Sequence, residues 1–317
     1  MRAIGLFLFL ALLASSAQAE LRPFGSETVS FKPLPVVTDP HPLDPRIRYA
    51  GGYSIEAHGT SQVDGLSDLQ LTTVSSGLKV EAISDLGAAV TFNLVDDGQG
   101  GFRDSPVTVD LLRQEDGHAY NDRNRNDAED IAFDAATGTT YVAFERWQRV
   151  MAYSSWKGAG RKMALGRLPV FPANSGMEGL AWLADRQSLL IGVESGGFWL
   201  CPIKDLACRE IDGPPPPGFL YMLTSLAPVP GRPGELLALY RYYDPFTGPR
   251  SILSHVKLQG DRLVKLDDMA KIEPPLTYDN YEGVAAVVTT GGYRLYLISD
   301  GLKPDAPPHL LIYDWTL

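Results

Sequence analysis

The sequence predicts an all-β chain folded as a β-propeller, and three observations carry this prediction. A unit of two short apolar strands recurs along the chain, most clearly at residues 176–197, GMEGLAWLADRQSLLIGVESGG. No amphipathic helix of convincing length interrupts the copies. The copies of the unit recur at intervals of roughly 45 to 60 residues. Each copy forms a small sheet that cannot bury both of its faces alone and must therefore stack on its neighbours. Radial stacking gives a propeller, in which the first strand of each unit lines a central channel.

Five copies of the unit are visible, at residues 65–85, 127–146, 176–197, 222–241 and 281–300. Five copies leave roughly 60 residues for each blade, so a sixth, degenerate blade also has room. The first blade is expected to have strands near residues 66–72, 78–83, 88–94 and 106–112. Third strands are expected near residues 147–153 in blade two and 251–258 in blade four. Blades three and five are expected to begin at Glu178 and Glu282.

Acidic residues stand at two places in the unit: at the head of its first strand and at the end of its second. The acids of the first place are Glu129, Glu178 and Glu282, with Asp68 near it in the first copy. The acids of the second place are Asp85, Glu145, Glu194 and Asp300. The copy at residues 222–241 has Thr224 and Tyr240 in these two places.

The first-place acids should point into the mouth of the channel, because the innermost strand begins there. The second-place acids lie near the same mouth or one layer further out. Several carboxylates on one axis repel one another, and a hard cation with oxygen ligands, Ca²⁺ above all, would relieve that repulsion. The alternative is that each acid only caps a strand end and accepts hydrogen bonds from turn N–H groups.

A polar loop, EDGHAYNDRNRNDAED at residues 115–130, precedes the second blade. Asp122, Asn124 and Asn126 have the alternate spacing of a calcium loop, but Asp127 stands where an EF-hand requires glycine, and Phe133 where it requires glutamate. An EF-hand is therefore not expected. The loop is expected to lend oxygen atoms to the channel mouth or to be a solvated turn.

The first 19 residues, MRAIGLFLFLALLASSAQA, have the pattern of a secretory signal peptide. One arginine precedes the apolar run, and the small-x-small ending predicts Sec-type cleavage after Ala19. Residues 20–47 are rich in proline and are expected to form a surface lead-in, and residues 48–317 to form a single propeller domain. The mature protein is expected in the bacterial periplasm or secreted.

The formal net charge is −10, which argues against binding to nucleic acid. No later apolar run is long enough for a membrane-spanning helix. We expect a monomer that acts on a small molecule, and an anionic substrate would need a bound metal or local arginines to attract it.

The two cysteines, Cys201 and Cys208, flank Lys204-Asp205 symmetrically. If these two residues form a hairpin turn, the cysteines face each other across the ladder and can form a disulfide in an oxidising compartment. The alternative is a pair of buried thiols. The alternating segment at residues 48–57 and the terminal PPHLLIYDWTL are expected to share one sheet, so that the N-terminal strand joins the last blade and closes the ring.

Five signals in order, GLSDL, DAEDIAF, NSGMEGLAWL, LLALYR and DNYEGVA, followed by a terminal LLIYDW, resemble the phytase-like family, also described as "esterase-like activity of phytase". The resemblance covers nearly all of the mature chain. It implies an exported propeller and, by analogy with calcium-dependent propeller phytases, hydrolysis of phosphoesters or esters at metals held by channel acids.

The resemblance also implies roles for individual residues. The metal ligands would be Glu129, Glu178 and Glu282, supported by Asp68, Asp85, Glu194 and Asp300. Glu178 would take part in catalysis, and Arg146 and Arg241 would receive a phosphate oxygen as forked donors. The chain departs from the family pattern in blade four, where Thr224 and Tyr240 remove two carboxylates from one side of the channel.

Three functions remain open on the sequence. The first is a metal-dependent hydrolase of phosphoester or ester bonds, in which the metal activates water. The second is a non-catalytic periplasmic binding or scaffold propeller with a structural cation. The third is a lactonase-like propeller enzyme with a channel metal. A serine esterase is not expected, because the chain has no Gly-x-Ser-x-Gly elbow.

Overall fold

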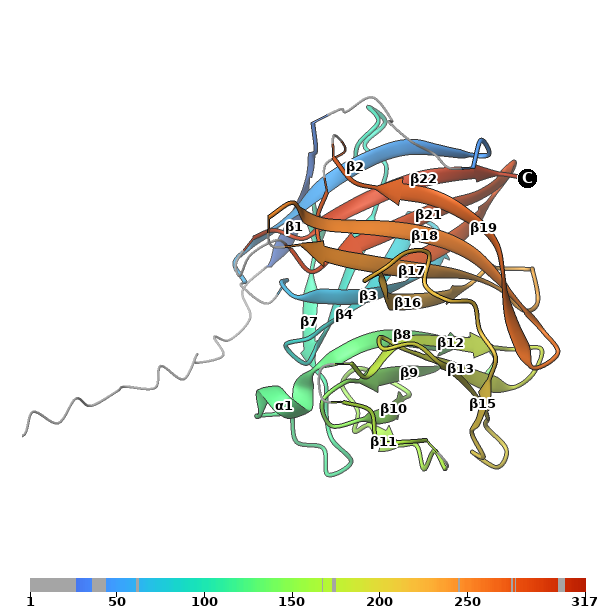
Figure 1. Ribbon diagram of the computed structural model, residues 1–317. Helices are drawn as coiled ribbons and strands as arrows, with labels where there is room; N and C mark the ends of the chain where they lie inside the picture. Colours follow the sequence, from blue (N-terminus) through green and yellow to red (C-terminus); the bar gives the residue numbers. More distant parts are fainter. Residues whose placement is uncertain are drawn as a thin grey trace, which may run out of the picture.

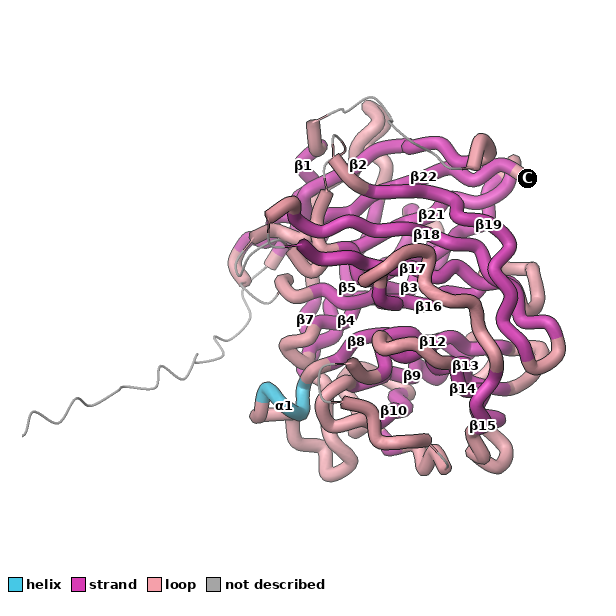
Figure 2. The backbone as a smooth tube through the Cα atoms, viewed as in Figure 1, coloured by secondary structure: helices cyan, strands magenta, loops and turns pink. Residues whose placement is uncertain are grey.

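The computed structural model describes residues 27–35, 44–60, 63–166, 168–172, 175–244, 246–274, 276, 278–301 and 306–317. The expected signal peptide and its cleavage point after Ala19 lie outside the described residues. The described chain is almost entirely β-structure (Figure 2), with one four-residue helix, α1 (Arg123–Asn126). No described helix has the length and apolar character that crossing a membrane requires.

Five antiparallel sheets form the five blades of a propeller (Figure 1), so the described chain has no sixth blade. Blade one contains β3 (Leu66–Val74), β4 (Gly77–Ser84), β5 (Ala88–Leu94) and β7 (Thr108–Leu111). Blade two contains β8 (Ala128–Asp134), β9 (Thr139–Phe144), β10 (Arg149–Tyr153) and β11 (Arg161–Lys162). Blade three contains β12 (Met177–Leu183), β13 (Ser188–Val193), β14 (Phe198–Pro202) and β15 (Arg209–Ile211).

Blade four contains β16 (Met222–Pro228), β17 (Glu235–Asp244), β18 (Gly248–Gln259) and β19 (Arg262–Ile272). Blade five contains β20 (Tyr281–Thr289), β21 (Gly292–Ser299) and β22 (His309–Thr316). Three further strands complete its sheet: β2 (Ile47–His58), β1 (Thr28–Pro33) and β6 (Ser105–Pro106).

The ring is closed as the sequence predicts, because N-terminal β2 pairs with C-terminal β22. β1 then pairs with β2, and β6 pairs with β1 at the outer edge of the same sheet. The segment at residues 20–47, expected as a surface lead-in, therefore contributes a strand with buried Val29 and Phe31.

The innermost strands are the first strand of each blade: β3, β8, β12, β16 and β20. Each contacts the innermost strand of the next blade, and β20 contacts β3, so these five strands surround one axis. The apolar runs that follow, such as Leu189–Ile191 and Leu236–Leu239, are fully buried because neighbouring blades cover both of their faces.

Every innermost strand carries a β-bulge near its head. The register with the neighbouring strand shifts between Leu66 and Asp68, and the same shift recurs in the other four blades. A bulge adds one residue that has no direct partner across the ladder, and it re-aims the side chain of that residue. The five extra residues are Ser67, Glu129, Glu178, Thr224 and Glu282.

Cys201 and Cys208 form the expected disulfide in blade three. β14 and β15 are paired in a register that places these two cysteines opposite each other, at the turn end of the ladder. Both sulfur-bearing side chains are buried in the core between blades two and three.

Candidate metal centre at the channel mouth

The register of the strands defines the two acidic places more accurately than the sequence pattern does. The first place is the bulge residue of each innermost strand. The residue just before each bulge pairs with a residue on the second strand of its blade. The five residues paired in this way are Ser84, Phe144, Val193, Tyr240 and Ser299, and the second place is the next residue after each of them. The residues of the second place are therefore Asp85, Glu145, Glu194, Arg241 and Asp300.

The register refines the position of Asp68, predicted near the first place, and shows that the assignment of Tyr240 is wrong by one residue. In blade one, the first place belongs to Ser67, because the bulge shifts Asp68 one position further along β3, where its side chain is buried. In blade four, the second place belongs to Arg241 and not to Tyr240, which is buried against the apolar core of blades three and four. Blade four therefore adds a guanidinium to the ring of acids, in addition to lacking carboxylates.

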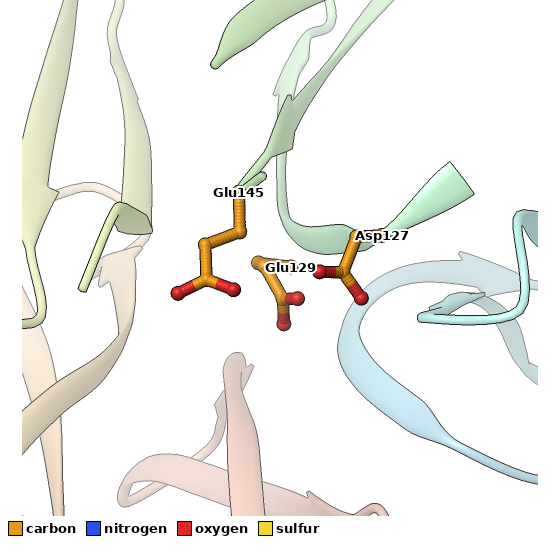
Figure 3. A group of neighbouring side chains, drawn as sticks. All are labelled: Asp127, Glu129 and Glu145. Carbon is orange, nitrogen blue, oxygen red and sulfur yellow. The ribbon is translucent and has the colours of Figure 1, made fainter. Parts of the chain in front are cut away.

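Two overlapping groups of carboxyl oxygens lie on the side of blades two and three. In the first group, oxygens of Asp127, Glu129 and Glu145 all lie within 4.8 Å of one another, and Figure 3 shows these carboxyl groups gathered in one space. In the second group, oxygens of Glu145, Glu178 and Glu194 lie within 4.8 Å of one another. Glu145 belongs to both groups, so it joins the acids of blade two to those of blade three.

The side of blades four and five is bridged by Arg241 and Asn280. Arg241 Nη1 donates to Asn280 Oδ1 at 2.7 Å and lies 3.5 Å from Glu282 Oε1. Arg241 Nη2 lies 3.8 Å from Glu194 Oε1. Asn280 Nδ2 donates to Glu282 Oε1 at 2.7 Å and to Asp300 Oδ2 at 3.2 Å. Arg241 is therefore an internal counter-ion between blades three and five.

Arg146 does not occupy a position equivalent to that of Arg241. It follows Glu145 by one residue, and its Nε lies 2.8 Å from Asp127 Oδ2. Its side chain is about one-third exposed, whereas that of Asp127 is buried. Arg146 thus neutralises Asp127 from the solvent side of the mouth.

Burial and mutual repulsion raise the pKa of the mouth carboxyls. Burial and then the charge of neighbouring carboxylates raise the pKa of Glu129 and of Glu178 well above its usual range. Burial raises the pKa of Glu145 to about 7 and that of Glu282 to about 8. These buried glutamates therefore bind protons more readily than free glutamates do, and a bound cation would compete with those protons.

The second-place acids Asp85 and Asp300 lie on the blade-five side of the mouth. Burial raises the pKa of Asp300, and the charge of Asp85 contributes to the raised pKa of Glu282. All of the predicted acidic residues except Asp68 thus surround one mouth. The loop at residues 115–130, expected to lend oxygen atoms to the mouth, contributes Asp127 to it. Asn280 was not among the predicted site residues, although it stands two residues before Glu282 as Asp127 does before Glu129.

The fold and the site define a five-bladed propeller with buried carboxyls at one end of its channel. Residues 61–199 match the family model named Phytase-like, described as "esterase-like activity of phytase". This segment contains blades one and two and most of blade three. Over these residues the match confirms the resemblance to the phytase-like family that the sequence motifs indicate.

Solved structures that resemble the chain share little sequence with it. The major allergen Mala s 1 of Malassezia sympodialis is 15% identical, with 84% of this chain and 87% of that chain covered and a TM-score of 0.42. An exo-beta-1,3-galactanase from Phanerochaete chrysosporium is 9% identical, with 77% and 59% covered and a TM-score of 0.47. No curated protein matches the chain.

The phytase-like match and the propeller fold support a hydrolase-like propeller. The disulfide and this fold indicate an extracellular protein. The acidic groups at the mouth could bind a metal ion, because carboxylate oxygens are the preferred ligands of hard divalent cations.

Proposed function

We propose that the protein is an exported, calcium-dependent hydrolase of phosphoester or ester bonds, acting as a monomer on a small molecule at the channel mouth. The observation that carries this proposal is the presence of two clusters of carboxyl oxygens at the mouth, both of which include Glu145. Two ligands on opposite sides of a Ca²⁺ ion at about 2.4 Å are about 4.8 Å apart, so oxygens gathered this closely have suitable spacing for one ion.

The arrangement favours a cation on the side of blades two and three. Glu129, Glu145 and Glu178 supply oxygens there, whereas Arg241 lies between Glu194 and Glu282 and neutralises the acids nearer to blades four and five. When bound, the cation would lower the pKa of a water molecule and polarise a phosphoryl or carbonyl oxygen. Glu178 would orient that water, and Arg146, on the solvent side, would receive an anionic substrate oxygen.

Export to the periplasm rests on the signal-like residues 1–19, with cleavage after Ala19, and on the disulfide, which forms in oxidising compartments. After cleavage, the propeller domain would begin at or before residue 48, and β1 would belong to it through its pairing with β2.

The proposal is tested on chelator-treated protein. Calcium and magnesium are titrated while thermal unfolding is followed, and phosphomonoesters, carboxylic esters and lactones are then assayed with and without chelator. We expect calcium to raise the melting temperature and to restore hydrolysis of a phosphomonoester or a carboxylic ester. Calcium binding without turnover of any substrate would favour a scaffold propeller. Turnover of lactones alone would favour a lactonase. The absence of any response to calcium would refute the metal site.

The stability of the cation-free protein should fall as the pH rises from about 5 to about 8. Burial raises the pKa of Glu145 to about 7 and of Glu282 to about 8 from an ordinary value of 4.5, so the folded state binds protons more tightly than the unfolded state does. That stabilisation is complete below pH 4.5 and is lost through pH 7 to 8, at a cost on the order of 3 to 5 kcal/mol for each of the two groups.

Urea unfolding in chelator at pH 5.5 and pH 8.5 measures this change. The double variant Glu145→Gln and Glu282→Gln is the reference, because other titrating groups remain in it. We expect a smaller loss of stability in the variant than in the wild type, and calcium should restore wild-type stability mostly at pH 8.5. An equal pH dependence in the two proteins would contradict the assignment.

A further inference from the structure

Two buried carboxyls, Asp68 of β3 and Asp130 of β8, lie on the channel axis next to the mouth. Their side chains are 2% and 0% exposed, and they face each other within hydrogen-bonding range. Each is the residue immediately after the bulge residue of its strand, so it belongs to the layer beneath the mouth acids.

Asp68 accepts hydrogen bonds with both of its carboxyl oxygens. Its Oδ2 accepts from the Ile131 N–H at 3.1 Å, and its Oδ1 accepts from the Val284 N–H at 3.2 Å and from the Ser225 hydroxyl at 3.3 Å. The Leu69 N–H also donates to this side chain. Asp68 is therefore surrounded by donors from several blades, which is the environment of a carboxylate.

Asp130 has a different set of contacts. Its Oδ2 accepts from the Leu180 N–H at 2.7 Å and from the Leu226 N–H at 3.1 Å. Its Oδ1 is buried and accepts no N–H or O–H from the described residues, while the carboxyl faces that of Asp68. Asp130 therefore uses one oxygen for both of its N–H donors, whereas Asp68 uses two.

The donors of these hydrogen bonds occupy the same position in every blade. Leu69, Ile131, Leu180, Leu226 and Val284 each stand two residues after the first-place residue of their strand. The pair thus binds the heads of all five innermost strands. Glycine makes room for it in blade five, where a Cβ on Gly283 would lie 2.7 Å from Asp68 Oδ1.

We propose that Asp68 and Asp130 are positioning residues, whose hydrogen bonds to the backbone of neighbouring innermost strands fix the spacing of the mouth glutamates. Glu129 and Glu178 each stand two residues before an amide that this pair holds. Outer partners of metal ligands commonly contribute 10- to 100-fold in metal affinity, and this pair supplies such support through the backbone. The expected effect on metal affinity rests on the proposed calcium site. The hydrogen bonds that hold the strands do not depend on that proposal.

Asparagine variants separate the two residues. In Asp130→Asn the amide oxygen can still accept from the Leu180 and Leu226 N–H groups, because both donate to the same oxygen, Oδ2. In Asp68→Asn the N–H₂ group must face an N–H donor. The matched control is Asp134→Asn, at the far end of β8, where Asp134 is buried and accepts from the Ala136 N–H and the Thr137 hydroxyl.

Two measurements are made on each folded variant: the calcium dissociation constant and native-state amide hydrogen exchange. We expect Asp68→Asn to weaken calcium binding by about 10-fold or more and to speed exchange at Ile131 and Val284. We expect Asp130→Asn and Asp134→Asn to remain within about threefold of the wild type in calcium affinity, with protection at Leu180 retained.

Equal calcium affinities in Asp68→Asn and Asp134→Asn would overturn the positioning role. A loss in Asp130→Asn equal to that in Asp68→Asn would contradict the greater dependence on Asp68, whose two oxygens both accept N–H groups. If Asp68→Asn does not fold, Asp130→Ala is measured in its place. We expect this variant to show faster amide exchange at Leu180 and Leu226 and about 10-fold weaker calcium binding. Unchanged exchange and affinity would refute the positioning role. If the wild type binds no calcium, the proposed function fails, and the exchange pattern alone decides whether the pair holds the strands.

Discussion

Replacing Glu178 by glutamine should remove the calcium response of the protein and, at pH 8, make the cation-free protein more stable. The Glu178 side chain is 8% exposed and shares one space with Glu145 and Glu194. Glutamine keeps the shape but removes the charge, so we expect calcium affinity to fall on the order of 100-fold. The cation-free protein gains stability because one source of repulsion among buried carboxyls is absent.

The opposite signs of these two effects separate the loss of a ligand from general damage to the fold. Calorimetric titration gives the calcium affinity, and urea unfolding in chelator gives the stability. The matched control is Glu115→Gln, which changes an exposed glutamate outside both carboxyl groups, whose Oε1 accepts from the Lys162 N–H. Equal calcium-induced shifts in the melting temperature for the two variants would refute a cation at Glu178.

Replacing Arg241 by glutamine should destabilise the cation-free protein by about 3 to 5 kcal/mol at pH 8, because removal of one partner leaves buried charges uncompensated. Arg241 lies between Glu194 and Glu282 and is bonded to Asn280. Without the guanidinium, these acids have no fixed counter-ion. Calcium should therefore stabilise the variant more than it stabilises the wild type.

Arg146→Gln is the control for this experiment, since it removes the same kind of side chain from the same mouth. Its side chain is 34% exposed, so its ion pair with Asp127 should contribute only about 1 kcal/mol or less. Urea unfolding of both variants, with chelator and with calcium, measures the difference. If the two variants lose the same stability and respond equally to calcium, Arg241 is not the internal counter-ion of the mouth.

The five blades, the closure of the ring and the disulfide could be predicted from the sequence, because the strand pattern recurs along the chain and is also present at both of its ends. Apolar strands such as the one at residues 188–193 recur with their turns, and Cys201 and Cys208 flank Lys204-Asp205 symmetrically, although the connection in the structure is longer than a two-residue turn. The gathering of Glu129, Glu178 and Glu282 at one mouth also followed from their shared place at the strand heads.

The exact register could not be predicted, because a β-bulge inserts one residue without leaving a distinct sequence signal. Matching acids to acids placed Asp68 beside Glu129, whereas the bulge gives that place to Ser67. A one-residue error assigned the second place of blade four to Tyr240, whereas the register gives it to Arg241, which was predicted only as a donor to a phosphate oxygen.

Asp130 was missed for a related reason. It follows Glu129 directly and looks like part of the same acidic turn, although successive side chains of a strand point to opposite faces. One signal could have identified it: the equivalent residues of blades three and five are Gly179 and Gly283, which leave space for a neighbouring side chain.

The closure of the ring also determines the order in which this chain can fold. Hairpins within blades two, three and four join neighbouring segments, so they can form as soon as those segments are available. The pairing of Ile47–His58 with His309–Thr316 joins the two extremes of the chain and has the highest loop-closure entropy. Folding intermediates should therefore be open arcs with an exposed strand edge, and that edge is where self-association during refolding would begin.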